Sequence, residues 1–319
     1  MFLENGFFPA NKFWKYLVGS LIIFTAAAIG QIPWMLAIAI KVFQTGKPFP
    51  TDETDMMTFL SLNKTLFLLL FSFVIAFIAI ILVIKYFHKQ SLLSVTTSRK
   101  KVDWKRILFS FSLWGFFTAG STLLLYYANP QDFVINFKPI PFLILAIIGI
   151  LLIPVQTSTE EYVFRGYLMQ GFAVLAKNRW FPLVMTSLIF GTMHIANPEV
   201  EKLGYIILVY YIGTGFFLGI ITLMDEGMEL ALGFHAANNL IAALLVTSDW
   251  SAFQTNSIFK DISEPSAGFE ILVPVFIIFP LLLFIFSKKY NWSNWKEKLT
   301  GNIIIVKQIK NSGNDGSNE

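Results

Sequence analysis

The stretch "PFLILAIIGILLIPV" (residues 141–155) is followed almost at once by "STEEYVFRGY" (158–167), and this junction decides the fold. The first part holds no charged residue, whereas the second places two glutamates and an arginine close together. An apolar helix of about 20 residues crosses the ~30 Å hydrocarbon core of a membrane. The sequence therefore predicts a transmembrane helix that carries ionisable groups at its end.

The whole chain shares this apolar character. Of its 319 residues, 55% are hydrophobic and 14% are charged, whereas soluble domains contain about 25% charged residues. Lipid offers backbone groups no hydrogen-bond partner, so spanning segments must form helices or closed barrels. We predict an all-α fold, a polytopic transmembrane helical bundle of about eight spans.

The expected spans are the apolar segments of sufficient length. They lie near residues 17–40, 65–84, 107–128, 140–159, 181–197, 203–224, 230–247 and 269–287. The fourth is expected to continue as a helix to about Ala176, with Pro154 as a candidate kink. The apolar run of the first passes beyond the small-residue stretch "TAAAIG" (25–30), which favours a retained helix over a cleaved signal peptide.

The distribution of basic residues predicts the orientation. With a cytoplasmic N-terminus, 18 of the 24 Lys and Arg residues fall on the cytoplasmic side. We therefore expect a multi-pass protein of the cytoplasmic membrane with both termini in the cytoplasm and lipid around it. We attribute the net charge of +4 to topology and expect no nucleic-acid partner. The absence of cysteine excludes disulfides, thiolate zinc sites and cysteine nucleophiles.

Few ionisable residues lie at membrane depth, and they concentrate in three neighbouring segments. A charge in hydrocarbon costs at least ~2.5–3.5 kcal/mol, so such residues face a protein interior or a water-filled cavity. We therefore predict one polar chamber. Its candidate members are Glu160, Glu161, Arg165, His194 and His235. His88, at the end of the second span, is expected to be a membrane-interface residue.

Helical spacing orients these groups. Glu161 and Arg165 are four residues apart, so they share a face and can neutralise each other. Glu160 points about 100° away and is expected to have no such local partner. His235 and Asn239 are also four residues apart, on one face of the seventh span.

A hairpin with its turn at 177–180 would bring Glu160 and His194 to one depth, because each lies 17 residues from Lys177. His235 lies only six residues after Glu229, so a tilt or a buried 225–229 loop must make up the difference. In the fifth span, Gly191 permits close helix approach.

A carboxylate and an imidazole in one confined site can activate a water. A second histidine and an asparagine can donate hydrogen bonds to a developing oxyanion, a set that suits amide hydrolysis. Alternatively, Glu160, His194 and His235 could be three zinc ligands with water as the fourth. The chain lacks the His-Glu-x-x-His spacing, and both readings stay open.

Three motifs carry a resemblance to a known family. "EEYVFRG" (160–166) matches Glu-Glu-x-x-x-Arg, "FGTMH" (190–194) matches Phe-x-x-x-His, and "HAANN" (235–239) matches His-x-x-x-Asn. In this order, on successive membrane helices, they resemble the CPBP family, also called the ABI or CAAX-protease-like family, which includes type II CAAX prenyl endopeptidases. The resemblance covers about residues 140–247.

The resemblance implies an intramembrane endopeptidase. By motif, Glu160 looks like the water-activating base with His194 as its partner. Glu161 and Arg165 look like a supporting ion pair, and His235 and Asn239 like the oxyanion-binding pair. The family has been described both as metalloproteases and as glutamate-dependent peptidases, so the cofactor is zinc or none. The resemblance divides the chain into N-terminal transmembrane helices (1–139), a catalytic core (140–247), a last helix (248–290) and a partly disordered cytoplasmic tail (291–319).

The substrate implied by the resemblance is a membrane-associated peptide or protein, prenylated and of CAAX type in eukaryotic members. The alternative is a non-catalytic bacteriocin-immunity or peptide-binding protein of the same family. A transporter or proton channel would spread ionisable residues along several spans or show an inverted repeat. The sequence shows a compact cluster and no repeat.

Overall fold

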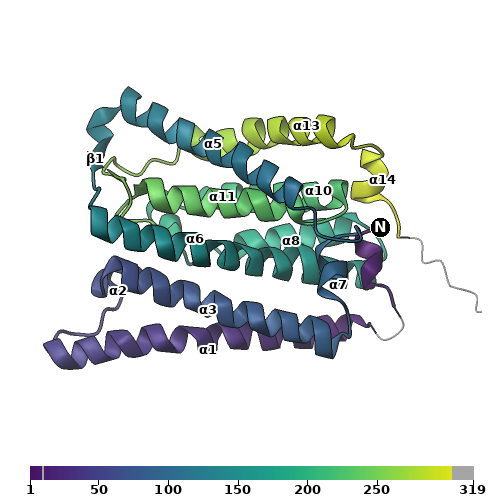
Figure 1. The fold of residues 1–319 in the computed structure, drawn as a ribbon, viewed down its shortest axis with the longest axis horizontal. Helices are drawn as coiled ribbons and strands as arrows, with labels where there is room; N and C mark the ends of the chain where they lie inside the picture. Colours follow the sequence, from purple (N-terminus) through teal and green to yellow (C-terminus); the bar gives the residue numbers. More distant parts are fainter. Residues whose placement is uncertain (9–10, 304–319) are drawn as a thin grey trace, which may run out of the picture.

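The computed structural model describes residues 1–8 and 11–303 and forms the predicted all-α bundle. In Figure 1 five helices lie side by side in the order α1, α3, α6, α11 and α5, with α8 and α10 behind them. The helices that correspond to the expected spans are α1 (Phe13–Thr45), α3 (Leu62–Leu82), α5 (Trp104–Ala128), α6 (Pro139–Glu161), α8 (Trp180–Thr192), α10 (Ile207–Asp225), α11 (Glu229–Leu245) and α13 (Phe279–Tyr290).

Within the described residues, six helical segments are long and apolar enough to cross a membrane, whereas α8 and α11 are shorter apolar helices. The six support a multi-pass membrane protein. Short helices and turns complete the chain: η1 (Leu3–Gly6), α2 (Glu53–Phe59), η2 (Val83–Phe87), α4 (Leu92–Thr96), η3 (Pro130–Asp132), α9 (Pro198–Leu203), α12 (Phe269–Val273), η5 (Pro274–Ile278) and α14 (Trp295–Thr300).

The fourth helix continues as predicted. After α6, the π-helical segment η4 (Tyr162–Leu168) and α7 (Met169–Ala176) extend it to Ala176. Lys177 then adopts a left-handed conformation (φ 55°) and ends the helix. The Asn178 side chain accepts a hydrogen bond from the Phe181 amide at the start of α8 (2.9 Å), so the expected hairpin turn is confirmed.

The fifth expected span is wrong at its far end, because α8 stops at Thr192 instead of reaching residue 197. Pro198 begins α9, and Asn197 before it is extended (φ −65°, ψ 144°). A proline fits the first turn of a helix but pushes the preceding residue out of helical geometry. His194 therefore lies in a turn after α8 and not on a membrane helix.

Gly191 brings α8 against α10, as predicted. A Cβ at this position would lie 2.8 Å from the backbone nitrogen of Ile212. Gly233 does the same for α11 and α5, since a Cβ there would lie 2.9 Å from the carbonyl carbon of Ile107. Only a residue without a side chain allows these backbones to approach so closely.

The 225–229 loop between α10 and α11 is buried. His235 can therefore lie deep in the bundle although it follows Glu229 by only six residues. Asp225 is 4% exposed and Glu229 is fully buried. Gly227 pairs with Thr97 in an isolated β-bridge, and the Phe2 amide donates to the Glu226 carboxylate (2.6 Å). The loop thus lies beneath the N-terminal residues and the segment before α5.

A small sheet closes the opposite end of the bundle and was not predicted. It has the order β1 (Phe133–Ile135), β3 (Phe259–Asp261) and β2 (Val246–Thr247), with β1 antiparallel and β2 parallel to β3. The last expected span, near 269–287, is formed by α12, η5 and α13, which together run from Phe269 to Tyr290. Of the expected tail, α14 is helical, and residues 304–319, where disorder was expected, lie outside the described residues.

His88 is not an interface residue, because it is 1% exposed. Its Nε2 lies 2.8 Å from the Tyr167 hydroxyl, and its Nδ1 hydrogen-bonds to Asn11. The N-terminal segment covers this end of α3 and supplies the polar partner that the basic sequence around His88 did not suggest.

Candidate active site

The expected ion pair lies at the junction of α6 and η4. Arg165 Nη1 donates to Glu161 Oε1 at 3.1 Å, and both side chains are completely buried. The guanidinium also donates to the Gly215 carbonyl oxygen (3.3 Å) and stands 4.4 Å from the ring centre of Phe190. A buried charge without a partner is costly, so this pair anchors α6 against α8 and α10.

His235 of α11 joins this pair. Its Nδ1 lies 2.7 Å from Glu161 Oε1. An ionised carboxylate only accepts hydrogen bonds, so Nδ1 must carry the hydrogen. The other ring nitrogen, Nε2, lies 3.6 Å from Glu160 Oε2. His235 therefore sits between the two glutamates, and the buried one fixes its orientation.

Glu160 is the exposed member of the cluster, with 18% of its side chain accessible. No arginine or lysine of the described residues forms an ion pair with it, in line with the expected lack of a neutralising partner, but Gln156 Nε2 donates to Glu160 Oε1. Gln156 lies one helical turn earlier, and this four-residue spacing was a signal that sequence reasoning missed. One carboxylate oxygen thus binds an amide, and the other faces His235.

Asn239 shares the face of α11 with His235, as its spacing predicted. It contacts a different partner, however, since its Nδ2 donates to Gln156 Oε1 at 3.1 Å. The two α11 side chains therefore reach α6 on either side of Glu160: His235 contacts the carboxylates, and Asn239 contacts the glutamine that holds Glu160.

His194 belongs to the same region but stands further from Glu160 than His235 does. Its Nδ1 lies 2.7 Å from the Phe190 carbonyl oxygen, and its ring stacks on Tyr211 with centres 4.4 Å apart. The Phe190 ring packs against both histidines, 4.9 Å from His194 and 6.1 Å from His235. Among the described residues, no hydrogen bond joins His194 to Glu160, so the base–partner pair implied by motif is not in direct contact.

The zinc alternative requires three ligands that converge. In the part of the chain that the structure describes, no group of three His, Asp or Glu side chains is arranged to hold a metal ion. Each histidine uses Nδ1 for a hydrogen bond, His235 to Glu161 and His194 to a backbone carbonyl, so only Nε2 of each ring could bind a metal. As placed, Glu160, His194 and His235 do not converge on one point, and they do not fit a three-ligand zinc site.

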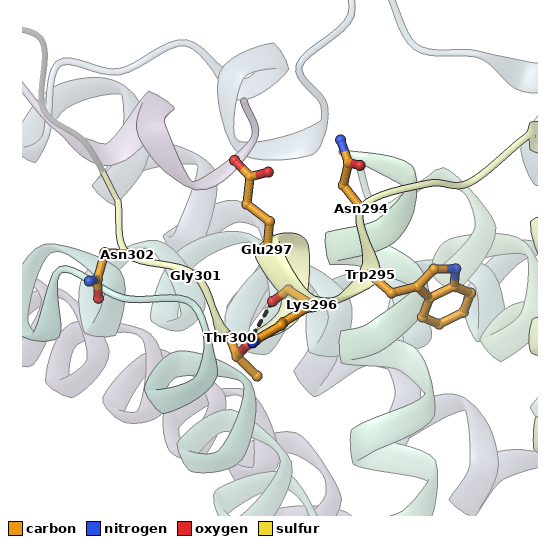
Figure 2. Close-up of a pocket in the computed structure, with 7 residues that line it drawn as sticks. All are labelled: Asn294, Trp295, Lys296, Glu297, Thr300, Gly301 and Asn302. Atoms are coloured by element: carbon orange, nitrogen blue, oxygen red, sulfur yellow. Dashed lines mark hydrogen bonds between the residues drawn. The ribbon is translucent and has the colours of Figure 1, made fainter.

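Two surface hollows lie outside this cluster. One surrounds α14 and is lined by residues 294–297 and 300–302, none of them in the motifs (Figure 2). The other borders the turn after His194, with Ile195, Asn197 and Tyr205 among its lining residues. The second hollow therefore lies next to the candidate site and the first does not.

Comparisons with known proteins agree with the motifs. Residues 138–241 match the family model described as type II CAAX prenyl endopeptidase Rce1-like. An uncharacterized protein of Bacillus subtilis (strain 168), YyaK, is 28% identical over 248 residues, which cover 76% of this chain and 81% of YyaK. No solved structure matches. Over the segment that carries all three motifs, the chain is thus similar to the Rce1-like family of type II CAAX prenyl endopeptidases, and the predicted resemblance is confirmed.

Proposed function

We propose that this protein is an intramembrane endopeptidase that hydrolyses a peptide bond of a membrane-associated peptide or protein, including prenylated substrates of the CAAX type. The observation that carries the proposal is the unequal environment of the two glutamates. Glu161 is buried against Arg165 and His235, whereas Glu160 is partly exposed and forms no ion pair with an arginine or lysine of the described residues. The family match supports a protease-like function in general.

Glu160 is the proposed general base. Gln156 holds one oxygen of its carboxylate, and the other oxygen is free to take a proton from water. The water oxygen then attacks the peptide carbonyl carbon, and the carbonyl oxygen becomes a tetrahedral oxyanion. Collapse of this intermediate breaks the carbon–nitrogen bond, and Glu160 returns the proton to the leaving amine.

The oxyanion needs hydrogen-bond donors in a site that excludes bulk water. Asn239 keeps one amide hydrogen beyond the one it gives to Gln156. His235, when protonated, presents Nε2–H beside Glu160. His194, whose ring lies on the same phenylalanine as His235, is the proposed second histidine that faces the substrate.

The direct test is cleavage of a quenched CAAX-type peptide, prenylated and unprenylated, by the protein purified in detergent. We expect Glu160→Gln to lower turnover by about 10²–10⁴-fold, the usual contribution of a general base. Thermal unfolding should stay unchanged, because the partly exposed carboxylate binds only neutral Gln156 and His235.

Asp249→Asn is the matched control, since Asp249 is an exposed carboxylate that pairs with Lys260 on the sheet end. This variant should cleave normally. Wild-type turnover by a folded Glu160→Gln protein would refute the proposed role of Glu160. It would favour a peptide-binding role without chemistry.

A further inference from the structure

A chain of side-chain hydrogen bonds runs from α5 across α11 to the candidate base. Trp114 Nε1 donates to Asn238 Oδ1 (3.0 Å), and Asn238 Nδ2 donates to Asn239 Oδ1 (3.1 Å). Asn239 Nδ2 donates to Gln156 Oε1 (3.1 Å), and Gln156 Nε2 donates to Glu160 Oε1. We call these residues the amide relay; they come from three helices, α5, α6 and α11, that are far apart in the sequence.

The two ends of the relay fix its direction. The indole N–H of Trp114 can only donate, and an ionised carboxylate at Glu160 can only accept. Each carboxamide between them must therefore turn its oxygen toward Trp114 and its NH₂ toward Glu160. A flipped amide would place two donors or two acceptors face to face, which is costly in a buried site. The relay thus delivers an N–H to Glu160 Oε1 in one orientation.

Helix packing holds the distant end in place. The close approach at Gly233 brings α5 onto α11, and Trp114 is 6% exposed with its ring 4.5 Å from that of Phe234. Gln156 at the other end of the relay is 3% exposed.

We propose that Trp114, Asn238 and Gln156 are positioning residues that act through the amide relay to hold the Glu160 carboxylate in one orientation, with its Oε2 aimed at the reacting water. The proposal rests on the proposed function for its kinetic consequence only. Without the hydrogen bond from Gln156, the carboxylate can rotate away from this orientation. A misplaced catalytic group lowers the rate of the chemical step without weakening substrate binding.

The test compares two variants of the relay with one control variant, all in the full-length protein. Gln156→Met keeps the side-chain length and removes both hydrogen bonds, and Trp114→Phe removes only the donor at the far end. Trp34→Phe is the matched control, because Trp34 is 7% exposed and its Nε1 has no partner among the described residues.

We expect kcat to fall about tenfold in Gln156→Met and about two- to threefold in Trp114→Phe, with KM little changed. Trp34→Phe should match the wild type. Wild-type kcat in both Gln156→Met and Trp114→Phe would overturn the proposal.

A second readout needs no cleavage. Dicyclohexylcarbodiimide is an apolar reagent that modifies protonated carboxyl groups, and mass spectrometry locates the adduct on Glu160. At a fixed pH, Glu160 should be modified faster in Gln156→Met than in the wild type, and by a smaller factor in Trp114→Phe, because a carboxyl group that the relay no longer holds turns more freely toward the reagent. Wild-type modification rates in both variants refute the relay. If the wild type cleaves no peptide but these rates change, the relay stands and the proposed function falls.

Discussion

At the turn between α10 and α11, every carboxylate of a charged cluster contacts an arginine; six residues further along α11, His235 meets two glutamates, of which only one pairs with an arginine. The first group, the turn cluster, consists of Arg99, Arg106, Asp103, Asp225 and Glu229. The second, the motif cluster, consists of Glu160, Glu161, Arg165 and His235. Both are largely buried and lie ~9 Å apart along one helix.

The difference lies in which carboxylates contact an arginine. In the turn cluster, Arg99 donates to both Asp225 (2.9 Å) and Glu229 (3.0 Å), and Arg106 contacts Asp225 and Asp103. In the motif cluster, Arg165 pairs with Glu161, whereas Glu160 forms no ion pair with an arginine or lysine of the described residues. Burial of charge alone therefore does not distinguish the two clusters; a carboxylate that faces a histidine and no arginine does.

Among the variants of the two clusters, Arg165→Met is expected to lower the free energy of unfolding most. It leaves Glu161 charged, fully buried and without its cation, for which the expected cost is about 3–5 kcal/mol of unfolding free energy. Unfolding in detergent, followed by intrinsic fluorescence, measures the loss. Arg165→Lys should be intermediate, because it restores charge but not the planar fork that also reaches Gly215. Wild-type stability of Arg165→Met would show that the pair does not anchor α6.

Arg99→Met should cost less, about 1–2 kcal/mol, because Arg99 is one-quarter exposed and Arg106 remains to neutralise Asp225. The sharper expectation concerns catalysis: the pH–rate profile should keep its wild-type shape, since the turn cluster has no part in proton transfer. Unfolding and peptide cleavage are measured on one preparation. A displaced acid limb in this variant would mean that the two clusters are electrostatically coupled.

The smallest expected effect concerns the hydrogen-bonded network around His88 and the dependence of stability on pH. Burial, and then the nearby charge of Lys15, lower the pKa of His88 from 6.5 to about 4. The unfolded chain takes up this proton near pH 6.5 and the folded chain only near pH 4. Stability is therefore fully present above 6.5 and falls as the pH drops toward 4.

In His88→Gln, which cannot titrate, the decline of stability over that window should be shallower than in the wild type. Thermal unfolding at several pH values between 6.5 and 4 gives both slopes. Parallel slopes in the two proteins would mean that other groups dominate the acid sensitivity of the fold.

Local pattern predicted much of this molecule. The spans followed from apolar length, and the Glu161–Arg165 contact followed from helical spacing. The predictions that were wrong concerned residues whose surroundings depend on distant partners or on the backbone between helices. Pro198 removed His194 from its helix, and the N-terminal segment buried His88.

Gln156 shows a different limit. Its four-residue spacing from Glu160 is visible in the sequence. The sequence does not show that Asn239 contacts it, and without that contact its part in the site could not be predicted. Trp114 is further still from any motif, and only the packing of α5 on α11 connects it to the site. The roles of the site residues remain predictions that the experiments above address.

The π-helical segment after the glutamates has a consequence for how insertions and deletions are tolerated. A π-helical turn holds more residues than the 3.6 of an α-helix, and such segments behave as one-residue insertions. Deleting Leu168 would leave every letter of the three motifs in place, but the segment would then close as an ordinary α-helix. The side chains within the segment, Arg165 among them, would turn away from their present neighbours while α7 keeps its place. The sequence of the motifs can therefore stay intact while the contacts they make are lost, so the length of this segment is itself information.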